Sequence, residues 1–211
     1  MTCLAHHRTP LISAAHEIET IKLHLGCGRR AREGWVNLDR VHGRGVDVVA
    51  DLNEVVLGSL PFEDDCFDEM FGRDILDRVR SPVDLMSELY RIARPGCQLV
   101  LQMPHGASDE AWSNPYTVRP FFPESFKGFS QPYYWKGGQD YTADWQVGFV
   151  LLKLSKERYL GVPHAERLRD VREKRNVVLE MTAVLTAMKP SRPRDRNLMP
   201  VPRTEILLVE D

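Results

Sequence analysis

The chain has 211 residues, of which 43% are hydrophobic and 27% charged, a composition typical of one soluble globular domain. Its 28 Lys and Arg face 30 Asp and Glu, so the net charge of −2 provides no overall basic field for nucleic acid. Apolar runs such as 149–152 are far shorter than the ~20 residues that span a bilayer, and residues 1–20 lack a continuous signal-peptide core. We therefore expect a cytoplasmic protein without a membrane segment.

The cysteines are few and far apart. They stand at positions 3, 27, 66 and 97 and form no C-x-x-C pair. The sequence therefore predicts neither a disulfide framework nor a thiolate metal site.

The first half of the chain alternates strand and helix signals. Short apolar runs predict five strands, at 21–25, 35–38, 46–50, 67–71 and 98–103. Before the last of these, Ser81 suits an N-cap, Pro82 suits the first helical position, and Pro95-Gly96 is expected to end the helix. Strands joined by crossovers predict an α/β fold with a mainly parallel sheet, whose ligands bind outside the carboxyl ends of the strands.

The second half is less regular, and we expect it to belong to the same single domain, 1–211. Residues 104–145 are rich in aromatics and prolines without strict periodicity, which is typical of a lid or acceptor-binding segment. The densely charged stretch 163–175 predicts a solvated helix. The Pro- and Arg-rich stretch 189–203 is interpreted as a hairpin-connecting loop, with a basic contact surface as the alternative. Candidate closing strands, of which the first two are equally compatible with helices, are 149–154, 177–188 and 205–209.

A glycine turn ends the first predicted strand. Gly26-Cys27-Gly28 puts two residues without Cβ where the backbone passes close to a ligand, and with Ala31 it matches G-x-G-x-x-A. Only six residues, 29–34, separate this turn from the next strand, whereas a crossover helix needs about a dozen. Asp39 ends that strand, where a carboxylate can accept two ribose hydroxyl protons. The pattern favours a ligand with a ribose and without a pyrophosphate.

Several motifs, in this order along the chain, resemble class I S-adenosylmethionine-dependent methyltransferases. They are Leu23–Gly28, Gly34–Asp39, Val46–Leu52, Leu60–Phe62 with Phe67–Glu69, and Glu88–Gly96. The chain is most similar to the compact, type 11-like branch, in which G-W-V-N-L-D follows the glycine turn. The resemblance covers residues 21–105 and extends to 114–121 with 124–126. It implies a Rossmann-like, doubly wound, mainly parallel sheet with an antiparallel edge strand and a shortened first crossover.

The resemblance also implies the cofactor, S-adenosylmethionine, and its contacts. Its methionine and ribose would pass the backbone of the glycine turn, at Leu25, Gly26, Cys27 and Gly28. Asp39 would hold the ribose hydroxyls, and the Asp51 carboxylate would accept from the adenine amine beside Leu52. Gly72 and Arg73 would face the methionine amino group through their carbonyls. A strand-end turn is the alternative role for Asp39 and Asp51, and no thiol chemistry is expected of Cys27.

The residues for catalysis depart from the family pattern. The family often has His-x-Leu-Glu-His after the fourth strand, and this chain has Asp74-Ile75-Leu76-Asp77-Arg78, which removes both histidines. Our hypothesis is that Asp74 positions or deprotonates the acceptor, with helix capping as the alternative. His105 is a second candidate base, with a plain loop histidine as the alternative.

Three residues of the segment 104–145 are candidates for binding the acceptor. Trp112 and Tyr116 could stack on a planar acceptor or serve as lid core. Arg119 could bind an anionic group or pair with an internal carboxylate. Asn114-Pro115-Tyr116 lacks one proline of the N-P-P-Y motif of enzymes that methylate nucleic-acid bases, which disfavours that activity.

The sequence thus predicts methyl transfer by in-line displacement to the oxygen or nitrogen of a small metabolite, sugar or natural product. The main alternative is a non-catalytic accessory protein with the methyltransferase fold, which the missing histidines allow. A nucleic-acid methyltransferase and a nicotinamide-binding oxidoreductase are less favoured. Both a homo-oligomer and a protein partner remain open.

Overall fold

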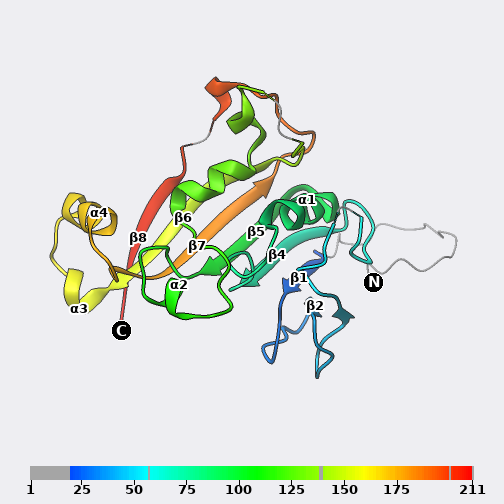
Figure 1. The fold of residues 1–211 in the computed structure, drawn as a ribbon, viewed down its shortest axis with the longest axis horizontal. Coiled ribbons are helices and arrows are strands. Elements are labelled where there is room, and N and C mark those ends of the chain that lie inside the picture. The colour runs from blue at the N-terminus through cyan, green and yellow to red at the C-terminus, as the bar shows by residue number, and fades with distance from the viewer. Residues whose placement is uncertain (1–19, 57, 138–139, 200, 211) are drawn as a thin grey trace, which may run out of the picture.

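An eight-stranded sheet forms the body of the computed structural model, which describes residues 20–210 apart from 57, 138–139 and 200 (Figure 1). The strand order is β3-β2-β1-β4-β5-β7-β6-β8. The strands are β1 Lys22–Leu25, β2 Val36–Asp39, β3 Val48–Val49, β4 Phe67–Arg73, β5 Ala93–Met103, β6 Trp145–Ser155, β7 Val178–Ala187 and β8 Arg203–Val209. This architecture confirms the α/β, Rossmann-like, mainly parallel fold.

The antiparallel strand is β7, and it lies inside the sheet rather than at its edge. It pairs antiparallel with both β5 and β6, whereas every other pairing is parallel. Met181, Ala183 and Leu185 of β7, which point to the same face of the sheet, are fully buried. The expectation of an antiparallel edge strand was therefore wrong in position. The edges are β3 and β8.

The stretch 189–203 is not a hairpin connection. It joins β7 to β8, and these two strands lie on opposite sides of β6, to which β8 pairs in parallel. Arg192 holds this stretch in place through Asp144, which precedes β6. The strands β6 and β7 also exclude the helical alternative for 149–154 and 177–188.

The helices are short apart from two. They are α1 Pro82–Ile92, α2 Glu110–Ser113, α3 Lys156–Tyr159 and α4 His164–Glu173, with 3₁₀ turns at Pro123–Phe129 (η1), Gln131–Tyr134 (η2) and Arg196–Leu198 (η3). The charged stretch 163–175 is helical, as predicted, in α4. Figure 1 shows α3 and α4 at the far end of β6, remote from β1 and β2. No helix of the described residues is long and apolar enough to cross a membrane.

Helix α1 starts as the sequence predicts and ends earlier. The Ser81 hydroxyl accepts from the Asp84 backbone N–H, and Pro82 occupies the first helical position. The helix ends at Ile92, because Ala93 is already extended and pairs with Phe67 of β4. Pro95 therefore lies within β5, and the Pro95-Gly96 pair does not mark the helix end.

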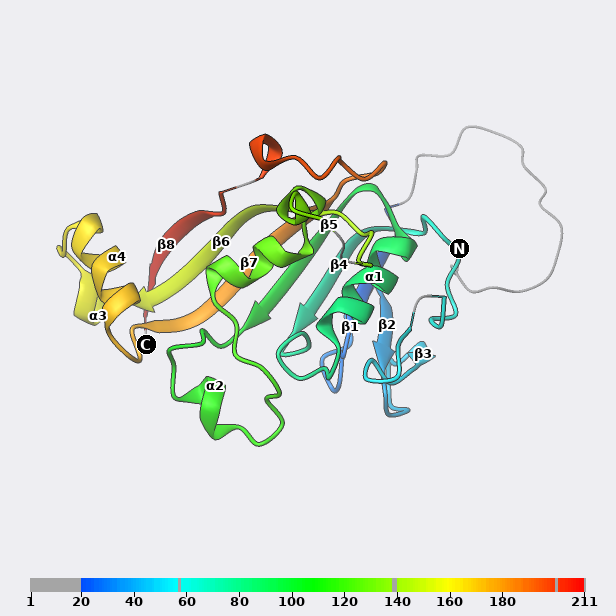
Figure 2. The same cartoon turned by 45° about the horizontal axis from the view of Figure 1, so that its top comes forward.

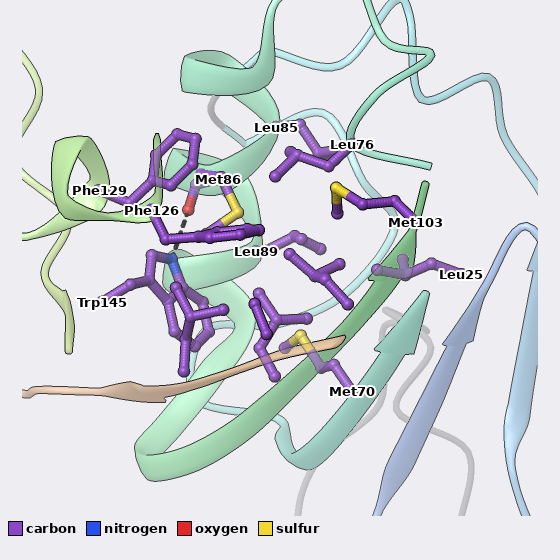
Figure 3. Packing of buried hydrophobic residues seen from close by; sticks show 14 of the residues in the cluster. Leu25, Met70, Leu76, Leu85, Met86, Leu89, Met103, Phe126, Phe129 and Trp145 are labelled. Atoms are coloured by element: carbon purple, nitrogen blue, oxygen red, sulfur yellow. Dashed lines mark hydrogen bonds between the residues drawn. The ribbon is translucent and has the colours of Figure 1, made fainter. Parts of the chain in front are cut away.

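The core lies between the sheet and α1 with η1. Leu85, Met86 and Leu89 of α1 are buried against the strands, and Phe126 and Phe129 of η1 extend this layer. Trp145, fully buried, donates its indole N–H to the Met86 carbonyl at 2.9 Å (Figure 3). Figure 2 shows α1 lying across this face of the sheet. The aromatics of η1 are thus core residues.

The connections near the glycine turn are short. Residues 26–35 link β1 to the parallel β2 through turns, which confirms the shortened first crossover. The links from β2 to β3 and from β3 to β4 also contain no helix in their described residues. This sheet is therefore a reduced form of the doubly wound arrangement. The strand predicted at 46–50 shrinks to β3, because the Asp47 carboxylate accepts the Asn37 backbone N–H at 2.8 Å.

One cysteine departs from the sequence expectation. Cys66 is disulfide-bonded, although the spacing of the cysteines predicts no disulfide. Cys27 and Cys97 are free and buried. Spacing along the chain carries no information on which cysteines meet in three dimensions, which explains the wrong prediction.

Candidate functional site

Two adjoining cavities open at the carboxyl ends of the parallel strands. The first, of about 450 Å³, lies beyond β1, β2 and β3 and is lined by residues that include Gly26, Asp39, Asp51, Leu52 and Tyr116. The second, of about 440 Å³, extends from the glycine turn toward β4 and β5. The two cavities share Gly26, Arg73, Asp74 and Arg78. The two cavities therefore adjoin at these residues and form one cleft.

The glycine turn follows β1 and lines the cleft. Gly26 and Gly28 have φ of +60° and +52°, the left-handed region in which a Cβ is strained. A Cβ on Gly26 would lie 2.2 Å from Cδ1 of Ile75, whereas a Cβ on Gly28 would meet nothing within 4 Å. The backbone at Gly28 is thus open to a ligand.

Cys27 is the buried middle residue of this turn. Its backbone N–H donates to the Leu38 carbonyl at 3.0 Å, which ties the turn to β2. Burial raises the pKa of the Cys27 thiol, and the nearby Asp39 carboxylate raises it further. A raised pKa favours the neutral thiol over the thiolate at neutral pH.

Two carboxylates stand at the strand ends around the first cavity. The Asp39 oxygens accept from the backbone N–H groups of Gly28 at 2.8 Å and Val41 at 3.0 Å. One Asp51 oxygen accepts from the Asn53 backbone N–H at 2.9 Å. Each carboxylate thus makes the contacts of a strand-end turn, which is the alternative role that the sequence allows for it. Since a carboxylate has about four acceptor positions, each also keeps lone pairs for a ligand in the cavity that it lines.

Asp74 lies at the junction of the cavities with an unusual backbone. Its φ of +54° is left-handed, a conformation that is uncommon outside glycine and that Asp and Asn adopt more readily than most residues. Its N–H donates to the Gln102 carbonyl at 2.8 Å, and its carboxylate pairs with Arg78 at 3.2 Å. These contacts hold Asp74 against both cavities.

Asp77 is a buried carboxylate behind this junction. Its side chain is 3% exposed, neither oxygen has a hydrogen bond from the described residues, and Arg78 Nε lies 3.9 Å away. Burial raises the pKa of Asp77 to about 6, although Arg78 opposes this shift. Its backbone carbonyl accepts from the N–H groups of Val118 and Arg119 at 2.9 and 3.1 Å. Asp77 thus anchors the segment that carries Tyr116 to the first cavity.

Other candidate residues lie away from the linings of these two cavities. His105 is buried, packs edge-on against Phe122 at 5.2 Å, and accepts the Ala107 N–H at Nδ1. Burial lowers the pKa of His105. Trp112 lines a third, more open hollow beside the end of α4 and donates its indole N–H to the Gly106 carbonyl at 2.8 Å. Arg119 is exposed.

The remaining cofactor candidates are part of the sheet framework. Leu25 is fully buried in the core, and Gly72 pairs with it across β1 and β4. These two residues can therefore contribute backbone atoms only. Cys27, Gly28 and Arg73 line the second cavity. Among the described residues, no group of three or more His, Cys, Asp or Glu could hold a metal ion.

Arg29, Arg30 and Arg32 of the second cavity, and His24 on its wall, are not among the residues that the sequence predicted for the site. Asn37 donates its amide N–H groups to the carbonyls of Arg32 and Trp35, so its oxygen faces His24 Nδ1 at 3.3 Å as an acceptor. His24 therefore carries its proton on Nδ1. Burial lowers the pKa of His24, and the Arg32 guanidinium lowers it further. The run Arg29-Arg30-Ala31-Arg32 directly after the glycine turn was the available signal.

Solved structures share this fold at low sequence identity. A SAM-dependent methyltransferase from Archaeoglobus fulgidus aligns over 79% of this chain and 86% of its own, with 16% identity and a TM-score of 0.54. The YcgJ protein from Bacillus subtilis aligns over 82% and 93%, with 13% identity and a TM-score of 0.50. No protein-family model and no curated protein matches the chain. The likeness shows that the chain shares the Rossmann-like fold of these proteins.

Proposed function

We propose that this protein is an S-adenosylmethionine-dependent methyltransferase that acts on a small molecule. The observation that carries this proposal is the first cavity, where the glycine turn, Asp39 and Asp51 meet at the carboxyl ends of β1, β2 and β3. In a sheet of this topology, ligands bind at that edge. The fold shared with a SAM-dependent methyltransferase supports the same function.

The residues of the first cavity fit the chemistry of the cofactor. In the first cavity the Asp39 lone pairs suit two ribose hydroxyls, and the open backbone at Gly28, on the side of the second cavity, leaves room for the part of the ligand that reaches the junction. Asp51 would accept from the adenine amine, and the apolar side chains of Leu38 and Leu52 would contact the ring. When bound, the cofactor supplies a methyl group on a positively charged sulfur. The backbone carbonyls of Gly72 and Arg73 are proposed to face its amino group.

The junction of the cavities is the proposed place of reaction. In-line displacement depends mainly on alignment of the acceptor and exclusion of water. Asp74, held by Arg78 and by the Gln102 carbonyl, is proposed to orient the acceptor or to take its proton. Residues 104–145 are proposed as the acceptor-binding segment, because Tyr116 from this segment reaches the first cavity.

The proposal is tested by calorimetric titration with S-adenosylhomocysteine and, separately, with NADH. We expect micromolar binding of S-adenosylhomocysteine and no binding of NADH. Asp39→Ala should weaken the former at least tenfold, since hydrogen bonds to a charged group contribute about 1.5–3 kcal/mol. Glu63→Ala, an exposed carboxylate outside both cavities, is the control. Tighter binding of NADH, or none of S-adenosylhomocysteine, would overturn the proposal.

A second experiment addresses Asp74 once an acceptor has been found by screening. Asp74→Asn keeps a residue that tolerates the left-handed backbone and removes the negative charge. We expect kcat to fall at least tenfold while the affinity for S-adenosylhomocysteine is unchanged. His105→Ala is the comparison. Unchanged pH–rate profiles of both variants would exclude a protein base.

A further inference from the structure

The second cavity concentrates positive charge in a chain whose net charge is −2. Its lining contains one carboxylate, Asp74, and five arginines: Arg29, Arg30, Arg32, Arg73 and Arg78. A concave site with one sign of charge attracts ligands of the opposite sign. The charge of this cavity is therefore opposite in sign to the net charge of the chain.

Only two of these arginines are neutralised within the described part of the chain. Arg73 pairs with Glu180 at 2.8 Å, and Arg78 pairs with Asp74 at 3.2 Å. Arg29, Arg30 and Arg32 have no ion pair to a carboxylate among residues 20–210 as described. Three guanidinium groups are thus available to a ligand.

Arg32 is held in place by the residues around it. Its guanidinium lies 3.6 Å from the ring centroid of Phe71 and 4.9 Å from that of Trp35. Its backbone N–H donates to the Asn37 side-chain oxygen at 2.8 Å. A guanidinium stacked on an aromatic face keeps the N–H groups on its edge free for a carboxylate or phosphate. Arg32 is therefore preorganised for an anion.

Arg29 and Arg30 lie at the mouth of the cavity within the glycine turn. The Arg30 N–H donates to the Cys27 carbonyl at 2.8 Å, which closes this turn. Both side chains are exposed. On the cavity wall, His24 stays neutral because burial and the Arg32 charge lower its pKa. The lining thus offers cations and a neutral imidazole beside the open backbone of Gly28.

We propose that the second cavity binds the anionic group of the acceptor, a small carboxylate or phosphate ester, through Arg29, Arg30 and Arg32. This inference rests on the proposed function, because the shared residue Asp74 puts such an acceptor next to the first cavity. Each cavity alone has the volume of a ligand site, about 300–1,000 Å³. The cleft therefore has the volume for the cofactor, whose methionine end is proposed to reach Gly28 and Arg73 at the edge of the second cavity, and for a small acceptor beside it.

The first test is titration with inorganic phosphate, alone and with saturating S-adenosylhomocysteine. We expect phosphate to bind in both conditions with the same Kd. Arg30→Ala and Arg32→Ala should each raise this Kd about tenfold, and Arg30→Lys should raise it less, since a lysine keeps the charge and loses the fork geometry. Arg44→Ala, an exposed arginine outside both cavities, is the control. Absence of phosphate binding would overturn the proposal.

A second arm separates the acceptor from the carboxylate of the cofactor itself. 5′-Methylthioadenosine lacks the amino-acid part of the cofactor and serves as the reference. The proposal predicts that Arg30→Ala changes the affinity of neither this compound nor S-adenosylhomocysteine. The opposite result is that S-adenosylhomocysteine displaces phosphate and that Arg30→Ala weakens the binding of S-adenosylhomocysteine but not that of 5′-methylthioadenosine. In that case the anion bound by the arginines is the cofactor carboxylate, and the proposal is wrong.

Two further outcomes are distinguishable. A single-stranded oligonucleotide that displaces phosphate more strongly than equal concentrations of phosphate monoesters would overturn the proposal in favour of nucleic acid. Phosphate binding that depends on Arg30 and Arg32, in a protein that binds no S-adenosylhomocysteine, would overturn the proposed function and the acceptor role together. The anion site itself would then stand.

Discussion

The Asp39 carboxylate accepts the backbone N–H of Gly28 at 2.8 Å and so joins the end of β2 to the glycine turn after β1. The same side chain lines the first cavity. Asp39 therefore both shapes the turn and presents oxygen atoms to a ligand. Its substitution affects two properties, which must be measured separately.

Asp39→Asn separates these two properties. The amide oxygen can still accept from Gly28, whereas the bond from the Val41 N–H to the other oxygen is lost, so we expect the free energy of unfolding to fall by only about 0.5–1.5 kcal/mol. The affinity for S-adenosylhomocysteine should fall, because hydrogen bonds to a charged acceptor are roughly twice as strong as neutral ones. Urea unfolding and calorimetry measure the two effects. Unchanged affinity would contradict a role of Asp39 in ligand binding.

Gly26 and Gly28 should respond differently to alanine. Both have positive φ, but a Cβ at Gly26 would also lie 2.2 Å from Ile75 Cδ1. We expect Gly28→Ala to cost about 1 kcal/mol of unfolding free energy and Gly26→Ala about 2–4 kcal/mol. Adding Ile75→Val, which removes Cδ1, should recover part of the loss in Gly26→Ala only. Equal effects of the two single substitutions in urea unfolding would contradict the close contact.

Asp77 should make the folded state less stable as pH rises. The pKa of Asp77 in the folded state, about 6, exceeds the value of 3.8 for an unperturbed aspartate. The contribution of the protonated carboxyl to the stability of the folded state is therefore full below pH 4 and is lost as pH rises through 6. The difference between these two pKa values corresponds to about 3 kcal/mol of unfolding free energy at most. We therefore expect Asp77→Asn to be more stable than the wild type at pH 7.5 and equal to it at pH 4.

Urea unfolding of both proteins at the two pH values tests this expectation. Glu63→Gln, at an exposed carboxylate, is the control and should track the wild type at both. A stability difference between Asp77→Asn and the wild type that does not vary with pH would show that ionisation of Asp77 is not its cause.

Asp144 and Arg192 form a buried pair that fixes the connection from β7 to β8. Asp144 is fully buried, and Arg192 donates to both of its oxygens at 2.8 Å. Removal of one partner leaves an uncompensated charge, so Arg192→Ala should cost about 3–5 kcal/mol. The double variant Asp144→Asn/Arg192→Met should lose less than Arg192→Ala alone. Thermal and urea unfolding of the wild type and the two variants provide the comparison, and a loss in the double variant as large as that in Arg192→Ala would show that the unpaired Asp144 charge is not the cause.

Local sequence was sufficient to predict the features around the first cavity. Alternation of apolar residues up to Gly26 predicts β1, the six residues after Gly28 leave no room for a helix, and Ser81-Pro82 starts α1. These features depend on near neighbours in the chain, since capping, turn chemistry and side-chain alternation act over a few residues. The predicted strands also place Asp39 and Asp51 at the same cavity, because the carboxyl ends of parallel strands lie at one edge of the sheet.

The way in which distant segments meet could be learned from the folded molecule alone. The insertion of β7 between β5 and β6, and the parallel pairing of β8 with β6, depend on contacts across more than fifty residues. The same holds for Arg73 and Arg78, which join the arginines at 29–32 around one cavity, and for His105, which is buried against Phe122 instead of lining the cleft. Such contacts arise because burial of the whole core selects them, and no periodicity in a single segment encodes that choice.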